Sequence, residues 1–201
     1  MPHPLHALAR RSRRLLAVAA IFCLGLSESG LAQVAASATA VDSSTATAAY
    51  LLNFLRFTEW PPEPGASDIA APYVIGVAGN RDLLDSLITL VEGRTVRGHP
   101  LRVTRIKDAR NALGCHVVYL EGEKIGDDYL LSPDEVVPLL QGRPVLTVSN
   151  APGFVARGGL VQLFREGTQL RFAINTDALP ATGLALNSRL LALSRKPPAA
   201  P

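Results

Sequence analysis

The sequence predicts an α/β fold, with a mixed, mostly parallel sheet flanked by helices and an antiparallel hairpin near the C-terminus. Between residues 73 and 148, short apolar runs typical of buried strands alternate with helical stretches, as in βα units. Two further strand-like runs are joined by Arg165-Glu166-Gly167-Thr168, a hairpin signature. The alternation predicts parallel pairing, and the hairpin predicts an antiparallel edge.

The first 32 residues have the pattern of a secretory signal peptide. Four arginines between residues 10 and 14 precede an apolar run of about a dozen residues, whereas a membrane span needs about 20. Gly30-Leu31-Ala32 places small residues at the −3 and −1 positions of a cleavage site. We therefore expect cleavage near Ala32 and an exported mature protein that acts outside the cytoplasm. An uncleaved short anchor is the alternative.

Removing this segment changes the composition. The whole chain has 20 Lys+Arg and 17 Asp+Glu, and the first 32 residues hold four Arg and one Glu, which leaves 16 of each. The neutral mature chain gives no indication of nucleic-acid binding. Cys115 becomes its only cysteine, and His99 and His116 its only histidines. This supply is thin for a metal site, so we predict no metal and no cofactor.

The mature chain predicts one domain over residues 48–194. An Ala/Ser/Thr-rich stretch over 33–47 indicates a flexible lead-in, and a Pro/Ala tail over 195–201 indicates disorder. Capping and proline signals set several boundaries, as at Ser132-Pro133. In chain order we expect a helix over 47–59, a strand over 73–78, a helix over 82–91, strands over 101–106 and 115–120, a helix from 132 to 140, strands over 145–148, 160–164 and 169–174, a helical turn over 176–182 and an amphipathic segment, strand or helix, over 184–193.

The first helix carries the clearest surface candidates. Tyr50, Phe54 and Phe57 fall on one side at helical spacing, while Asn53 and Arg56 lie on the opposite edge. Trp60 projects near that edge, and Trp and Arg are the usual anchors of protein interfaces. Packing of the Trp60 side chain over the following prolines explains a tryptophan at this position equally well. The candidate partner-binding residues are Asn53, Arg56, Phe57 and Trp60.

A loop after a buried strand is the candidate ligand site. Open α/β sheets bind ligands beyond the carboxyl ends of their strands, which here points to the crevice near Asn80. Ordinary turn chemistry is the alternative, because Asn and Gly are common in turns. The candidate ligand residues are Ser149, Asn150, Gly158 and Gly159.

The pair Cys115-His116 could place a thiolate beside an imidazole. Adjacent strand residues point to opposite faces, however, so we expect Cys115 to face the core as a small apolar group. A redox role or pairing between chains is the alternative. The chain contains no Gly-x-Ser-x-Gly, His-Glu-x-x-His or Cys-x-x-Cys motif, and we predict a non-catalytic protein.

Four sequence blocks stand out by their order and spacing. They are AAYLLNFLRFTEWP at 48–61, GCHVVY at 114–119, VLTVSNAPGFVARGG at 145–159, and RFAIN at 171–175 with NSRLL at 187–191. These blocks resemble the YfiR/HmsC family of periplasmic proteins. The resemblance spans about residues 48–194, and the order and spacing of the blocks make it specific.

This resemblance implies a regulator without catalytic residues. Characterised members repress an inner-membrane diguanylate cyclase by binding its periplasmic sensor region, which lowers cyclic-di-GMP and biofilm formation. An outer-membrane lipoprotein relieves the repression in those systems, and a homodimer is an expected assembly. Some members carry a further cysteine in the strand that corresponds to residues 73–78, where this chain has Gly76, so an internal disulfide is not expected. The rival interpretation is a periplasmic protein that binds or senses a small ligand.

Overall fold

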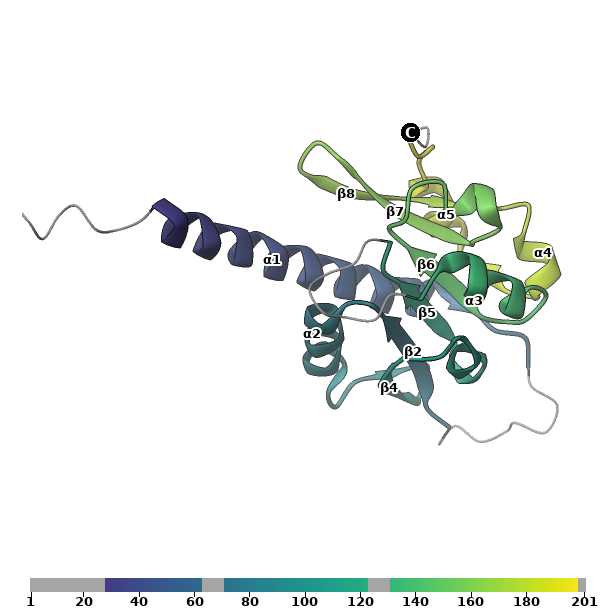
Figure 1. Cartoon of the computed structure of the whole chain (residues 1–201). Helices are drawn as coiled ribbons and strands as arrows, with labels where there is room; N and C mark the ends of the chain where they lie inside the picture. Colours follow the sequence, from purple (N-terminus) through teal and green to yellow (C-terminus); the bar gives the residue numbers. More distant parts are fainter. Residues whose placement is uncertain (1–27, 63–70, 123–130, 199–201) are drawn as a thin grey trace, which may run out of the picture. The chain divides into compact units, whose positions relative to one another are not determined.

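The computed structural model describes residues 28–62, 71–122 and 131–198 (Figure 1). The chain forms two compact units, Met1–Ala40 and Val41–Pro201, and the architecture below belongs to the second. Most of the predicted signal peptide, residues 1–27, lies outside the described residues, as does the end of the tail, residues 199–201. The signal peptide therefore stays a prediction.

A seven-stranded mixed sheet forms the centre of the domain, in the order β3-β4-β2-β5-β6-β7-β8. Its five inner strands are parallel, and β3 and β8 pair antiparallel at the two edges. The expected α/β fold is thus confirmed. The strands are β2 (Tyr73–Ala78), β3 (Thr95–Val96), β4 (His99–Arg105), β5 (Val117–Leu120), β6 (Leu146–Ser149), β7 (Val161–Glu166) and β8 (Gln169–Ile174).

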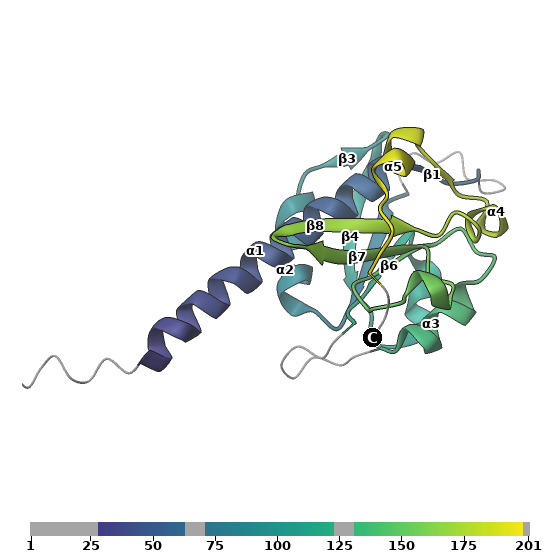
Figure 2. The same ribbon diagram turned by 90° about the horizontal axis from the view of Figure 1, so that it is seen from above.

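Helical segments cover both faces of the sheet (Figures 1 and 2). One core packs α1, α2 and α5 against residues such as Ile75, Val117 and Leu146. The other packs η1 and α3 against Val74 and Val118. Successive strand residues thus supply opposite cores, as the period of two requires. The helical segments are α1 (Glu28–Phe57), α2 (Arg81–Val91), η1 (Ala109–Gly114), α3 (Pro133–Leu140), η2 (Val155–Arg157), α4 (Leu179–Thr182) and α5 (Ser188–Leu193).

Side-chain caps start α2, α3 and α5 as well as η1, and the first two position elements near the site. Asn80 Oδ1 accepts a hydrogen bond from Leu83 N at 2.9 Å and caps α2. Ser132 caps α3 through Asp134 N, as its sequence indicates. Each cap satisfies a backbone N–H that has no partner within the helix.

The N-terminal helix differs from the expectation at both ends. The structure has helix where a flexible lead-in was expected over 33–47, a stretch rich in alanine, the best helix former. At the other end α1 stops at Phe57, because Thr58–Glu59 (β1) pairs with Ala185–Leu186 (β9) in a second, two-stranded sheet. The final segment expected as strand or helix is accordingly both, β9 followed by α5.

Candidate functional site

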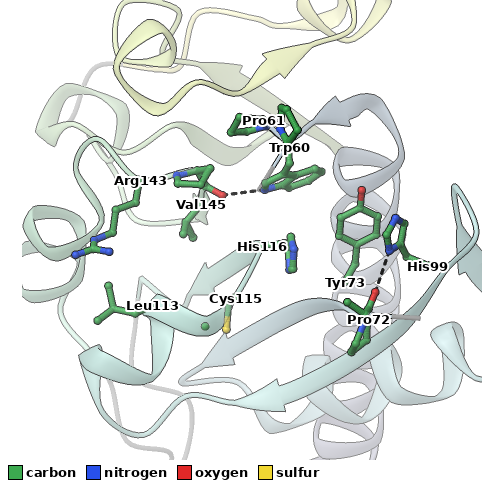
Figure 3. Close-up of a pocket in the computed structure, with 14 residues that line it drawn as sticks. Trp60, Pro61, Pro72, Tyr73, His99, Leu113, Cys115, His116, Arg143 and Val145 are labelled. Atoms are coloured by element: carbon green, nitrogen blue, oxygen red, sulfur yellow. Dashed lines mark hydrogen bonds between the residues drawn. The ribbon is translucent and has the colours of Figure 1, made fainter. Parts of the chain in front are cut away.

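A cavity of about 540 Å³ opens at the amino-terminal edge of the parallel strands (Figure 3). Its walls come from residues that precede or begin strands: Tyr73 begins β2, His99 begins β4, His116 precedes β5 and Val145 precedes β6. Trp60, just beyond β1, closes one side. The volume lies within the range of small-molecule sites, about 300–1,000 Å³.

Four rings form a contiguous cluster in this cavity. Trp60 lies 5.4 Å from Tyr73 and 5.7 Å from His116 between ring centroids, and the latter pair is edge-on. Tyr73 contacts His116 at 4.8 Å and His99 at 4.7 Å. Such edge-on and tilted arrangements are the favourable ones for aromatic pairs. Trp60 Nε1 also donates a hydrogen bond to Pro144 O at 2.8 Å, so the indole is held on two sides.

The backbone partners of the two imidazoles assign their tautomers. His116 Nδ1 accepts a hydrogen bond from Val74 N at 3.1 Å, which places the proton of the neutral ring on Nε2. His99 Nδ1 lies 2.9 Å from Ala71 O, a carbonyl that can only accept, so this nitrogen carries the proton. The two rings flank Tyr73 with opposite tautomers.

Cys115 belongs to the apolar side of the site. Its side chain packs in the core under η1 and α3 and is 6% exposed, while His116 stacks with Trp60 and Tyr73 on the other face. The expected divergence of these neighbours is therefore observed. Burial raises the pKa of the thiol to about 11, and the charge of Arg102 offsets part of that rise. A thiol of this pKa is protonated at neutral pH and is a poor nucleophile.

The opposite edge of the sheet holds a buried carboxylate. Glu121, 2% exposed, directly follows β5 and accepts hydrogen bonds from Asn80 Nδ2 at 2.6 Å, from Tyr119 OH at 3.1 Å and from Asn150 Nδ2. Burial, and secondarily the carboxylate, raises the pKa of Tyr119 well above its usual value. Asn150 Oδ1 also accepts from Gly122 N at 2.6 Å.

This network occupies the position where a ligand crevice was expected. The parallel strands run in the order β4-β2-β5-β6-β7, so chain order reverses between β2 and β5, and Asn80 and Glu121 follow those two strands. Ligands of open α/β sheets often bind at this place. Here the side chains bond to one another and tie three strand ends together. Sequence reasoning missed Glu121, although its signal was available as the first charged residue after an apolar strand.

The structure separates the four ligand candidates. Ser149 is fully buried and accepts a hydrogen bond from Ala151 N, and Asn150 joins the Glu121 network. Gly158 instead has a φ of 91° at the end of η2 and lines a second cavity of about 270 Å³ with residues of α3 and α4. At Gly159 a Cβ would overlap the ring of Phe154. Turn geometry and close packing account for both glycines.

The structure also divides the four partner candidates. Asn53, Arg56 and Phe57 are exposed on α1, and Phe57 is 42% exposed although its spacing predicted the apolar face. That expectation fails because α1 ends at Phe57, and the buried side chain at this point belongs to Thr58, which begins β1. Trp60 lies past the helix, where helical periodicity no longer applies, and its hydrogen bond and ring contacts are in the cavity.

Together these features define a three-layer α/β domain with an aromatic and imidazole-lined cavity at the amino-terminal edge of its sheet. In the described part of the chain, no three metal-ligating side chains come together and no helix has the length and apolar character of a membrane span. The family model described as YfiR/HmsC-like matches residues 44–195. The chain belongs to this family, which is a family of regulators, and the resemblance of the four sequence blocks is confirmed.

Proposed function

We propose that this protein is a non-catalytic periplasmic regulator that represses an inner-membrane diguanylate cyclase by binding its periplasmic sensor region. Repression lowers cyclic-di-GMP and thereby biofilm formation. Membership of the YfiR/HmsC-like family supports the regulatory role, because its characterised members act in this way. The proposal needs a surface on the protein that suits a protein partner.

The exposed face at the end of α1 is that surface. Asn53, Arg56 and Phe57 lie three and four residues apart, so they share one side of the helix. Arg97 reaches the same place, since its Nη2 lies 3.5 Å from both Arg56 O and Glu59 Oε1. An exposed phenyl ring on the same side as a cation and an amide is the mixture that forms anchor residues in interfaces. Phe57, 42% exposed at this point, is the observation that carries the proposal.

The test compares cyclic-di-GMP and surface attachment in a deletion strain complemented with variants. Arg56→Glu and Phe57→Ser should raise both readouts to the level of the deletion, because they remove a charge and an apolar anchor. The matched controls are Arg94→Glu and Ile88→Ser, which change an exposed cation and a 50% exposed apolar side chain elsewhere. The controls should behave as the wild type. A deletion that leaves cyclic-di-GMP unchanged would refute the proposal.

Two further partners belong to the same proposal. An outer-membrane lipoprotein is the expected antagonist, and its overproduction should reproduce the effect of the deletion. A homodimer is the expected assembly, and light scattering on the purified mature protein measures it directly. If the protein is a monomer at every concentration measured, the homodimer is ruled out, whereas the proposal of a cyclase partner is unaffected.

A second candidate function is favoured by the cavity. Its volume of about 540 Å³ and its ring-lined wall suit a small periplasmic metabolite, which would make the protein a ligand binder or sensor. A thermal-shift screen against metabolites distinguishes this from a regulator that binds only proteins. A rise of several degrees with one compound would favour the ligand function.

A further inference from the structure

The cavity beside Trp60 has walls of two kinds, planar rings and aliphatic groups. Trp60 and His116 are both held by hydrogen bonds to backbone groups, so their rings keep fixed orientations. Leu113, Cys115 and Val145 line the same cavity and offer no charge, since the Cys115 thiol is protonated at neutral pH. Fixed ring planes beside apolar groups favour a flat, apolar ligand body.

Among the described residues that line the cavity, the formal charge has one sign. None of the described residues that line it is acidic, whereas Arg143 is exposed at its rim. Figure 3 shows Arg143 at one end and Tyr73 and His99 at the other, with Trp60 and His116 between them. Arg143 forms no ion pair with the described part of the chain, so its guanidinium can turn toward an incoming anion. Guanidinium groups bind carboxylates through paired, charge-assisted hydrogen bonds.

From this arrangement we infer that the cavity binds a planar aromatic carboxylate, whose ring packs against Trp60 and His116 and whose anionic group pairs with Arg143. The inference goes beyond the proposed regulatory function and does not depend on it. A ligand of two fused rings fits the volume with room for water around its carboxylate. The backbone bonds that orient Trp60 and His116 form without the ligand, so the ring platform needs no ordering when it binds.

Isothermal titration of the mature protein with three probes tests the inference. The probes are 2-naphthoate, its uncharged analogue 2-naphthamide, and cyclohexanecarboxylate, which keeps the charge but lacks the flat ring. We expect 2-naphthoate to bind about tenfold more tightly than either, because each analogue loses one contact of ordinary strength. Failure of 2-naphthoate to bind, or equal binding of its amide, would overturn the inference.

Two variants locate the site. Arg143→Gln should reduce the affinity for 2-naphthoate about tenfold and leave 2-naphthamide unchanged, whereas Arg94→Gln, at another exposed arginine, should change neither. Gly114 lines the cavity, and a Cβ there would have no atom within 4 Å, so we expect the side chain of Gly114→Leu to be accommodated and to occupy part of the cavity. This variant should keep its melting temperature and lose binding of 2-naphthoate. Undiminished binding to either cavity variant would place the ligand elsewhere and overturn the inference.

Discussion

Cys115 and His116 are neighbours in the chain but have different surroundings. The thiol packs into the core beneath η1 and α3, and its Sγ donates a weak hydrogen bond to Asn111 O at 3.6 Å. The imidazole joins the ring cluster and accepts from the backbone of β2. These two residues precede β5, which begins at Val117 and not at Cys115 as expected, but the backbone of Cys115 is already extended, so the neighbouring side chains diverge and the thiolate–imidazole pair that their adjacency suggests does not form.

The buried thiol should be slow to react. Its pKa of about 11 leaves roughly one thiolate in a thousand at pH 8, so we expect iodoacetamide to modify the folded protein at least about tenfold more slowly than the denatured chain. The rate of modification of the folded protein should keep rising until the pH reaches the thiol pKa of about 11, whereas for an ordinary thiol it levels off near 9.0. Between these values the native thiol keeps a proton that the unfolded chain has lost, so stability falls as pH rises. Equal rates for folded and denatured protein would contradict this prediction.

Gly76 lies directly against the same thiol. A Cβ at this position would stand 2.8 Å from Cys115 Sγ and would overlap the side chain of Ile106. A cysteine at position 76 would thus point at Cys115, and the side chain of Ile106 occupies the space that it needs.

A double variant tests this geometry. In Gly76→Cys with Ile106→Ala, the overlap with Ile106 is removed while the new Cβ still stands 2.8 Å from Cys115 Sγ, and we expect a disulfide to Cys115 under oxidising conditions. Thiol counting in denaturant before and after reduction measures it. Gly76→Cys alone should be destabilised, because its side chain meets Ile106. Two free thiols in the oxidised double variant would show that the side chains diverge.

At the scale of elements, the Glu121 network fixes the carboxyl ends of three strands. Asn80 both caps α2 and donates to Glu121, so the start of this helix and the end of β5 are positioned by one side chain. Asn150 binds the carboxylate and the backbone of Gly122 together. A buried carboxylate needs such donors, because an unpaired charge in the interior is strongly unfavourable.

Removing one donor should have a measurable cost. We expect Asn150→Ala to lower the free energy of unfolding by about 1–3 kcal/mol, because it leaves Glu121 with fewer partners in a buried site. Asn53→Ala, at an exposed helix position, is the control and should change it by less than about 0.5 kcal/mol. Urea unfolding followed by circular dichroism gives both values. If Asn150→Ala lowers the free energy of unfolding as little as Asn53→Ala does, the prediction fails, because water then replaces the Asn150 amide as a donor to Glu121.

For the molecule as a whole, the fold was predictable from sequence because β2, β5 and β6 are compact apolar runs, β4 alternates apolar and polar residues, and clear caps and turns lie between them. The short strands β1, β3 and β9 have two residues each, which is too few to show any periodicity. They form only because each pairs with a neighbouring strand. Pairing of β1 also ends α1 early, which moved Phe57 to the surface and Trp60 into the cavity. The cavity could not be predicted, since Trp60, Tyr73, His99 and His116 meet only after the strands are ordered.

The pairing of β1 with β9 also bears on how the chain acquires its structure. Thr58 pairs with Leu186, and Phe57 O accepts a hydrogen bond from Asn187 N at 2.9 Å, so the end of the first helix is held by nearly the last residues of the domain. Contacts between such distant segments form late, because a long loop must close first. A polypeptide threaded through a translocation channel from its N-terminus cannot complete this domain until its C-terminal segment has emerged. The topology therefore suits the export that the predicted signal peptide implies, because the domain can close only after its C-terminal segment is through the channel.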